Sequence, residues 1–265
     1  MDAEERRRAP AADYDTFVDW EARLAREAPF FERLFERVGV ASVIDVGAGS
    51  GRHAVMFGMW GLTVDAVDPD DTMLSSAEAN IAAAAQTIAE NGGVVRLARA
   101  GFGELGSLGL GQTDAITCTG NALPHVAGIT GLRIALADFA ATLRPGGALV
   151  LHLLNHDRLL EKKPRALPPV VREVPEGTRV FLRVVDYPAG GEFLGFDFVT
   201  MVRDMAGVWT VASRTSAHTA LPHGVLIAEL ECEGFDEIET FGNHEGKPFD
   251  SDEDESLILV ARRES

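Results

Sequence analysis

The stretch "VIDVGAGSGRH" at residues 43–53 decides the fold, because it joins an apolar run to three glycines at alternate positions. The run predicts a buried strand over 42–46, and a helix is expected over 52–60. Glycine lets a backbone turn tightly and approach a ligand closely. The stretch therefore predicts a strand–turn–helix unit of the kind that holds nucleotides, and the surrounding residues must decide which nucleotide.

Two common nucleotide sites do not match this turn. A phosphate-binding P-loop needs Gly-Lys-Ser/Thr at its end, and no lysine follows here. A dinucleotide fingerprint needs a third glycine at the position of Arg52. The carboxylate of Asp45 would also repel a pyrophosphate, by ~4 kcal/mol for unit charges about 4 Å apart at an effective dielectric of about 20.

A cationic nucleoside without phosphates fits the turn better. S-adenosylmethionine carries a sulfonium, an ammonium group and a ribose, and Asp45 would attract its cationic groups. The backbone at Gly47, Gly49 and Gly51 can approach the amino-acid end of such a ligand. Asp68 ends the next predicted strand, where a carboxylate accepts ribose hydroxyls.

The order of predicted elements is that of an α/β fold. Helical periodicity covers residues 14–38, with a split or kink expected at Pro29. Alternating strands and helices then predict a Rossmann-like, seven-stranded, mostly parallel sheet with helices on both faces. Strands are expected at 42–46, 62–68, 93–98, 113–118, 148–154, 235–241 and 256–262, and helices at 52–60, 72–90, 130–143 and 224–233.

Residues 164–218 interrupt this alternation. A Pro-rich segment at 164–176 precedes three β-like runs that have no helix between them, at 178–187, 192–204 and 208–218. These runs predict an inserted antiparallel β subdomain. The expected domains are an N-terminal helical cap (1–40), a cofactor-binding domain (41–163 and 219–265) and an antiparallel substrate-side insertion (164–218).

Composition limits the partners. The 265 residues carry 41 acidic and 24 basic side chains, for a net charge of −17, which repels nucleic acid and anionic lipid. The basic run at residues 6–8 is interpreted as a solvated tail, and the acidic run at 250–256 as an exposed loop. We therefore expect a small-molecule partner, no nucleic acid and no membrane, and the sequence leaves homo-oligomer formation open.

Apolar segments and cysteines predict a cytoplasmic location. No stretch reaches the ~18 residues needed to cross a bilayer, and the charged N-terminus indicates no signal peptide. The two cysteines, Cys118 and Cys232, are far apart and form no CxxC pair. This usage suits a reducing compartment, and no metal site is predicted.

At this point the sequence resembles the class I S-adenosylmethionine-dependent methyltransferases. The block "LRPGG" at 143–147 is typical of that class. A narrower resemblance is to glycine and glycine/sarcosine N-methyltransferases. It rests on the predicted insertion and on the segments "YDTFVDWEARLAREAPFF" (14–31), "VDPDDTML" (67–74), "AGFGEL" (100–105), "TGNALPH" (119–125), "NHDRLL" (155–160) and, more weakly, "TFGNHEGKPF" (240–249).

The resemblance implies a set of site residues. In that family an arginine of the N-terminal helix binds the cofactor carboxylate, and Arg26 corresponds to it here. Met73, Gly101 and Phe102 correspond to the residues that flank adenine. Asn121 and His125 are the predicted catalytic residues, at the edge between cofactor and acceptor. The predicted cofactor-binding set is Tyr14, Trp20, Arg26, Asp45, Gly47, Gly49, Gly51, Asp68, Pro69, Met73, Gly101, Phe102, Thr119 and His125.

One position departs from the family pattern. Glycine-methylating members carry an arginine just before the asparagine of their "NHD"-like segment, and it holds the substrate carboxylate. Leu154 stands there in this sequence, and leucine cannot replace a bidentate arginine contact. The departure favours an acceptor that is larger or less acidic than glycine or sarcosine.

The expected reaction is an in-line displacement that transfers a methyl group to a small molecule, with an amine nitrogen as acceptor atom. Alignment of the reactants can supply ~7–11 kcal/mol of such a barrier. A neutral amine needs no base, whereas a protonated amine, a phenol or a carboxylic acid needs a proton acceptor. The candidate acceptors are His125, His152, His156, His218 and His223.

Other function classes remain as alternatives. They are an O-methyltransferase acting on a small acid or phenol, a nicotinamide-dependent oxidoreductase and a non-catalytic cofactor-binding module. Arg52 and Asp45 argue against the nicotinamide-dependent oxidoreductase. A nucleic-acid enzyme is disfavoured by the charge and by "TGNA" at 119–122, where enzymes that methylate base amines carry an "NPPY"-type tetrapeptide.

Overall fold

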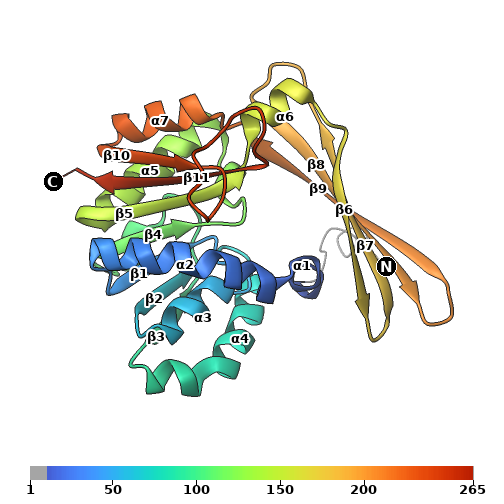
Figure 1. Ribbon diagram of the computed structural model, residues 1–265, viewed down its shortest axis with the longest axis horizontal. Coiled ribbons are helices and arrows are strands. Elements are labelled where there is room, and N and C mark those ends of the chain that lie inside the picture. Colours follow the sequence, from blue (N-terminus) through green and yellow to red (C-terminus); the bar gives the residue numbers. More distant parts are fainter. Residues whose placement is uncertain (1–10, 265) are drawn as a thin grey trace.

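A seven-stranded sheet forms the larger part of the computed structural model, which describes residues 11–264 (Figure 1). Its strands are β1 (Ser42–Val46), β2 (Thr63–Val67), β3 (Val94–Ala98), β4 (Thr113–Cys118), β5 (Leu143–Leu154), β10 (Phe235–Phe241) and β11 (Ser256–Arg263). They lie in the order β10-β11-β5-β4-β1-β2-β3. Strand β11 runs in the opposite direction to the other six, which are parallel to one another. The predicted Rossmann-like, mostly parallel sheet is confirmed. The basic run at 6–8 lies outside the described residues.

Helices cover both faces of this sheet (Figure 1). They are α1 (Ala11–Phe17), α2 (Trp20–Val38), α3 (Arg52–Met59), α4 (Asp71–Glu90), α5 (Gly128–Thr142), α6 (His156–Lys162) and α7 (His223–Cys232), with short 3-10 turns η2 (Leu105–Leu108) and η3 (Leu123–His125). Along β11, Ile258 packs in one core cluster with Phe31 and Phe57 of α2 and α3. Its neighbour Leu259 packs in the other cluster, with residues of α5 and α7. Burial on both faces explains why these strands are continuously apolar. None of the described helices is long and apolar enough to cross a membrane.

The N-terminal helical segment breaks at a different place from the one predicted. The chain leaves helix α1 after Phe17, and the side chain of Asp19 accepts a hydrogen bond from the Ala22 N–H at 3.1 Å. This N-cap starts α2 at Trp20. Helix α2 then continues through Pro29, which lies on its exposed side. The break at residues 18–19 lets α1 turn away from α2, and α1 contacts both α4 and the second sheet.

The second sheet is antiparallel throughout, as predicted, and has one strand more than expected. Strands β6 (Ala166–Val174), β7 (Gly177–Asp186), β8 (Phe193–Asp204) and β9 (Trp209–Thr219) pair in sequence order. Strand β6 forms within the Pro-rich segment. It tolerates Pro168 and Pro169 because it is an edge strand and because its register with β7 shifts between Leu167 and Val170.

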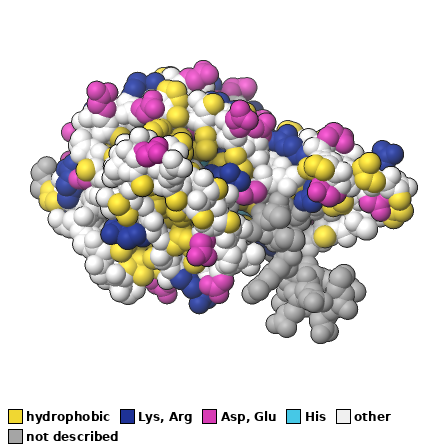
Figure 2. Space-filling model, turned by 90° about the horizontal axis from the view of Figure 1, so that it is seen from below, with side chains coloured by type: hydrophobic (Ala, Val, Ile, Leu, Met, Phe, Trp, Pro, Cys, Tyr) yellow, Lys and Arg dark blue, Asp and Glu magenta, His cyan; other side chains and the backbone are white. Residues whose placement is uncertain are grey.

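The far end of the second sheet carries exposed apolar side chains between its charged ones. The β8–β9 hairpin exposes Met205, Val208, Trp209 and Val211. Figure 2 shows this arm projecting from the body of the protein, with acidic and basic side chains interspersed over the visible face. No broad patch of a single sign is seen on that face.

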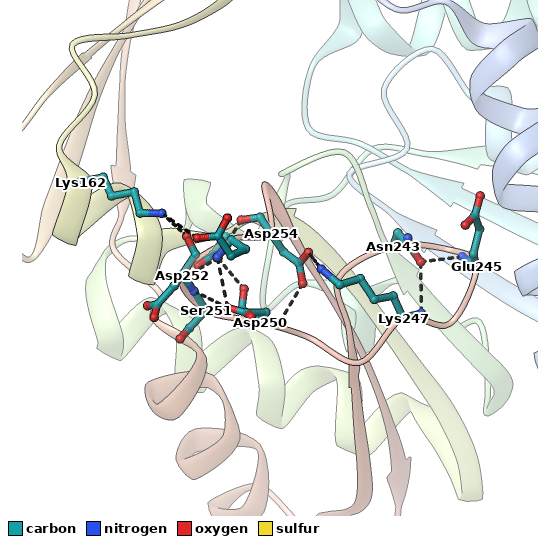
Figure 3. A network of polar contacts seen from close by, with 10 residues as sticks. Lys162, Asn243, Glu245, Lys247, Asp250, Ser251, Asp252 and Asp254 are labelled. Carbon is teal, nitrogen blue, oxygen red and sulfur yellow. Dashed lines mark hydrogen bonds and ion pairs between the residues drawn. The ribbon is translucent and has the colours of Figure 1, made fainter.

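The acidic run at 250–256 forms a largely exposed loop before β11, as predicted, and an ordered polar network holds it in place (Figure 3). Asp254 is buried, and its carboxylate accepts hydrogen bonds from Lys247 Nζ and from the Asp250 N–H. Lys162 of α6 donates to the carbonyl of Asp252. These contacts neutralise part of the negative charge and fix the loop between β10 and β11 against α6.

Asn155 is the centre of this network, and its replacement by alanine is expected to lower the free energy of unfolding by about 3 kcal/mol. The side chain is 1% exposed, caps α6 through the Arg158 N–H and donates to the carbonyls of Ser251 and Asp254. Denaturant unfolding of Asn155→Ala measures the loss. Lys162→Met, which removes an exposed contact to the same loop, should change stability by no more than about 0.5 kcal/mol. Equal effects of the two variants would contradict this account of the loop.

Candidate active site

A cavity of about 260 Å³ lies where the carboxyl ends of the parallel strands meet the second sheet. Ligands of open α/β sheets bind at this edge. Of the predicted site residues, Tyr14, Met73, Asn121 and His125 line the cavity. Its other lining side chains come from α1, α2 and the break between them (Phe17, Arg23, Val18), from β5 and β11 (His152, Leu153, Leu154, Ser256) and from the second sheet (Arg183, Phe196, Phe198, Arg214, Ser216, His218).

Close packing excludes a side chain at two glycines of the turn, whereas the space beside the third is open. Gly47, Gly49 and Gly51 all have left-handed φ angles, of 69°, 56° and 72°. A Cβ at Gly47 would lie 2.6 Å from Ala122 Cβ, and one at Gly51 would lie 2.9 Å from Ala77 Cβ. At Gly49 the nearest atom is Tyr14 Cε1 at 3.9 Å. The backbone at Gly49 is therefore the part of the turn that a ligand can approach.

Helix α1 is fastened to this turn through Asp15, a residue absent from the predicted set. Its carboxylate accepts hydrogen bonds from Ser50 Oγ at 2.5 Å, Arg52 Nη2 at 3.1 Å and Trp20 Nε1 at 2.9 Å. The predicted Trp20, the first residue of α2, is thus hydrogen-bonded to Asp15 of α1, and its ring packs edge-on against His53. These bonds place Tyr14 over the turn. An acidic residue near a helix end gives no sequence signal for such a role.

Asp45 lies at the end of β1 and is 1% exposed. Its Oδ1 accepts a hydrogen bond from Thr117 Oγ1 at 2.8 Å, and its Oδ2 has no partner among residues 11–264. Burial raises the pKa of this carboxyl, and the charge of His53 opposes the rise. A buried carboxylate oxygen without a donor is costly, so the site suits a ligand that brings a cation or an N–H.

The structure brings Arg23 of α2, and not the predicted Arg26, to the cavity. Arg26 is exposed on α2 and is absent from the cavity lining, whereas Arg23, about one turn earlier, lines the cavity. Arg23 Nε donates to Glu27 Oε1 at 2.8 Å, and the guanidinium lies 5.1 Å from the Trp20 ring centroid. Its Nη2 is buried and has no partner within the described chain. That donor is available to an anionic ligand group.

Asp68 braces the turn from the end of β2. Its two carboxylate oxygens accept hydrogen bonds from the Gly49 N–H at 2.8 Å and the Asp70 N–H at 2.9 Å. Burial raises the pKa of Asp68, and the two backbone donors oppose that rise. Each carboxylate oxygen has a second lone pair, so Asp68 retains acceptor capacity for ligand hydroxyls.

The remaining predicted cofactor residues surround the turn without lining the cavity. Pro69 is exposed, and the Gly101 N–H donates to Glu104 Oε2 at 2.6 Å. Phe102 packs against Phe139 with ring centroids 6.3 Å apart. Thr119 is buried, with its Oγ1 3.4 Å from His53 Nδ1. They lie at the same edge of the sheet as Asp68, but the described cavity does not extend to them.

Two histidines face each other across the cavity. The rings of His125 and His218 have centroids 4.4 Å apart. Burial lowers the pKa of His125, and it lowers the pKa of His218 to about 3, so both rings are neutral near pH 7. His152 also lines the cavity, whereas His156 and His223 do not. The structure thus reduces the five candidate proton acceptors to three.

Asn121 orients one of these rings. Its Oδ1 accepts a hydrogen bond from the Leu154 N–H at 3.0 Å, which turns its amide nitrogen toward His218 Nδ1 at 3.3 Å. With an amide donor at Nδ1, the assigned tautomer of His218 carries its proton on Nε2, which lies 3.2 Å from Ser216 Oγ. Asn121 adopts a left-handed φ of 67° to make these contacts.

A buried cluster of polar side chains, Glu27, His53, His152 and His244, contacts Arg23 through Glu27. Glu27 Oε2 lies 2.6 Å from His53 Nε2, and Glu27, His152 and His244 place ligand atoms within 4.8 Å of one another. Burial would raise the pKa of Glu27, but the hydrogen bond with His53 and the charge of Arg23 hold it well below its usual range. Residues of these types can bind metal ions. Here the guanidinium on Glu27 repels a cation, so we assign the cluster to holding Arg23.

His156, outside the cavity, gives folding a pH dependence. It is 1% exposed, its Nδ1 accepts the Leu221 N–H at 2.8 Å, and burial lowers its pKa from 6.5 to about 4. The unfolded chain therefore takes up the proton at higher pH than the folded chain. Stability from the neutral ring is fully present above pH 6.5 and is lost as the pH falls toward 4, by about 1.4 kcal/mol per pH unit.

The matched variant is His156→Asn, which keeps an acceptor for Leu221 and removes the titrating ring. Denaturant unfolding of both proteins across this pH window should give a steeper loss of stability for the wild type. Parallel pH dependences would show that His156 is not buried in its neutral form.

Residues 43–147 match the family model described as a methyltransferase domain. The glycine/sarcosine N-methyltransferase of Parasynechococcus marenigrum is 34% identical over 148 residues, 56% of this chain and 50% of that protein. The glycine N-methyltransferase of Homo sapiens is 28% identical over 152 residues, 54% of this chain and 50% of that protein. The chain spans about half the length of these curated relatives.

Two solved structures share the fold over nearly the whole chain. An S-adenosylmethionine-dependent methyltransferase from Clostridium acetobutylicum has a TM-score of 0.76 at 15% identity, covering 96% of this chain and 98% of that one. An S-adenosylmethionine-bound amino pentose methyltransferase from Micromonospora echinaspora has a TM-score of 0.72 at 22% identity, covering 99% and 97%. At these identities the likeness is one of fold.

The family match assigns residues 43–147 to a methyltransferase domain. The fold of the chain is that of solved S-adenosylmethionine-dependent methyltransferases, which supports the predicted resemblance to class I of these enzymes. The aligned relatives support the narrower resemblance to glycine/sarcosine N-methyltransferases.

Proposed function

We propose that this protein transfers a methyl group from S-adenosylmethionine to an amine nitrogen of a small molecule. The proposal is carried by two buried polar atoms without a hydrogen-bond partner among the described residues, the guanidinium Nη2 of Arg23 and the carboxylate Oδ2 of Asp45. Burial raises the pKa of Asp45, and the charge of His53, the hydrogen bond from Thr117 and the charge of Arg23 oppose the rise. An amino-acid zwitterion offers a carboxylate to Arg23 and an ammonium to Asp45.

The fit of the remaining residues supports the same ligand. The backbone at Gly49 can be approached, and Asp68 keeps lone pairs for the ribose hydroxyls. Met73, Gly101 and Phe102 are assigned to adenine. A pyrophosphate in place of the zwitterion would meet the unpartnered oxygen of Asp45, which disfavours a nicotinamide dinucleotide.

S-adenosylmethionine, when bound, supplies a methyl group activated by a sulfonium. The chain's own task is then to align the acceptor and to manage its proton. We assign the proton-accepting role to His125, because its neutral ring faces the cavity. Asn121, predicted as catalytic, is assigned a positioning role through His218, since its amide is engaged with Leu154 and with that ring.

Nitrogen is favoured as the acceptor atom by the names of the relatives. They are glycine and glycine/sarcosine N-methyltransferases, and the fold neighbours include a sugar N-methyltransferase. The second sheet, from which His218 enters the cavity, is proposed as the acceptor side of the site. The cytoplasmic location is part of the same proposal and agrees with the unpaired state of Cys118 and Cys232.

The test is calorimetric titration of the purified protein with S-adenosylmethionine, S-adenosylhomocysteine and NAD, followed by mass spectrometry of amines, phenols and carboxylic acids incubated with the methyl donor. We expect binding of the first two ligands and methylation of amines. Tight binding of NAD alone would overturn the proposal. Transfer only to phenols or acids would establish the O-methyltransferase alternative, and binding without any transfer would establish the non-catalytic one.

A further inference from the structure

Three neighbouring strands of the second sheet place two arginines in one row on the wall of the cavity. Arg183 of β7 lies opposite Phe198 of β8, and Phe198 lies opposite Arg214 of β9. Directly opposed residues of antiparallel strands point to the same face, and all three side chains line the cavity. The arginines are two strand spacings apart, about 10 Å at their Cα atoms. Their long side chains can therefore converge on a single group in front of Phe198.

Neither arginine of this row forms an ion pair with a carboxylate of the described residues. Within residues 11–264, Arg183 and Arg214 form no hydrogen bond and no ion pair, and no Asp or Glu lines the cavity. Arg183 stacks on Phe17, 5.3 Å from the ring centroid, and Glu255 is the carboxylate that acts on it from a distance. By contrast, Arg96, Arg133 and Arg165 are each paired with a carboxylate.

Among the described residues, the lining of the cavity carries arginines and no carboxylate, although the chain has 41 acidic residues against 24 basic ones. Arg183 is half-buried beside this carboxylate-free lining and loses hydration without gaining an ionic partner within residues 11–264, whereas Arg214 lines the cavity and is exposed. Burial accordingly lowers the pKa of Arg183. A ligand anion would supply the missing charge and a bidentate contact.

The row lies beside the acceptor end of the site. The charge of Arg214 acts on both His125 and His218. Arg23, which we assign to the methyl donor, is already paired with Glu27 and belongs to α2. An anion held by the second sheet therefore belongs to the acceptor, with its nitrogen directed toward His125.

We propose that Arg183 and Arg214 bind a carboxylate or phosphate on the methyl-accepting amine, so that the substrate class is an anionic amine. Phe196 and Phe198 offer apolar surface to the segment between the anion and the nitrogen. The row supplies from β7 and β9 the positive charge that is absent at Leu154, where the family pattern had led us to expect a less acidic acceptor. This proposal rests on the proposed methyl transfer.

The test uses two pairs of amines that differ only in the anion. β-Alanine against β-alaninamide examines a carboxylate, and O-phosphoethanolamine against ethanolamine examines a phosphate. Binding to the protein saturated with S-adenosylhomocysteine is measured by calorimetry, and methyl transfer by mass spectrometry. We expect the anionic member of at least one pair to bind about tenfold tighter or more, and to be methylated in preference to its neutral counterpart. The pair that responds identifies the anion.

Variants Arg183→Gln and Arg214→Gln should each reduce this preference by about tenfold, with S-adenosylhomocysteine affinity unchanged. The matched control is Arg203→Gln, an exposed arginine of β8 on the opposite face of the same sheet, which should leave the preference intact. Equal binding of both members of each pair, or a preference that survives in both variants, would overturn the proposal. If the wild-type protein did not bind S-adenosylhomocysteine at all, the proposed methyl transfer itself would be refuted.

Discussion

Replacing Arg23 by glutamine is expected to weaken S-adenosylmethionine binding by about 100-fold or more. The guanidinium is assigned to the cofactor carboxylate, and its loss would leave both that carboxylate and Glu27 without their cation. Calorimetric titration measures the effect on affinity. Because Arg23 also supports the buried cluster of Glu27, His53 and His244, thermal unfolding without ligand must be measured alongside.

Arg26→Gln is the matched control, since it removes an exposed arginine from the same helix. It should leave cofactor affinity within about twofold of the wild type, as expected of a surface substitution away from the site. The opposite result, with affinity lost in Arg26→Gln and kept in Arg23→Gln, would restore the assignment indicated by the sequence and refute the one made from the structure.

Asp68→Ala is expected to produce a loss of cofactor affinity of similar size, about 100-fold or more. The substitution removes the acceptor of the Gly49 and Asp70 N–H groups and, under the proposed function, the acceptor of the ribose hydroxyls. Each charge-assisted hydrogen bond of this kind contributes about 1.5–3 kcal/mol. Titration with S-adenosylhomocysteine is the direct measurement.

A neighbouring carboxylate provides the control for Asp68. Asp71 begins α4 and is 74% exposed in its ion pair with Arg99. Asp71→Ala should change cofactor affinity by less than about twofold. Unchanged affinity in Asp68→Ala would remove the ribose assignment and, with it, the argument that distinguishes a nucleoside ligand from a bare amino acid.

The main sheet could be predicted because its sequence signals are local. Each parallel strand is an apolar run between turn residues, and the glycine turn and Asp68 fall at strand ends. Strand β6 was missed because Pro168 and Pro169 argue against a strand, and only its edge position makes them tolerable. The break in the N-terminal helix was placed at Pro29, where an exposed proline is accommodated, whereas Asp19 creates the real boundary by capping α2.

The site was harder to predict than the fold, because it depends on contacts between distant elements. Arg23 and Arg26 are about one helical turn apart, so their spacing alone cannot say which one faces the cavity. The turn between α1 and α2 and the pairing with Glu27 decide it. For Arg183 and Arg214, alternation along the strands shows that they share a face with Phe198, but nothing local shows that this face closes the cavity.

The chain enters the antiparallel sheet and leaves it again at two points that lie close together in the main fold. It departs after α6, and the chain that returns from β9 is bound to the start of the same helix. There the Leu221 N–H donates to His156 Nδ1 and the His223 N–H to Asp157 Oδ2, both at 2.8 Å. Genetic exchange with breakpoints at these two junctions would swap the whole acceptor wall in one event, leaving the methyl-donor half untouched. Related enzymes could diversify their substrates by trading this module rather than by accumulating single changes.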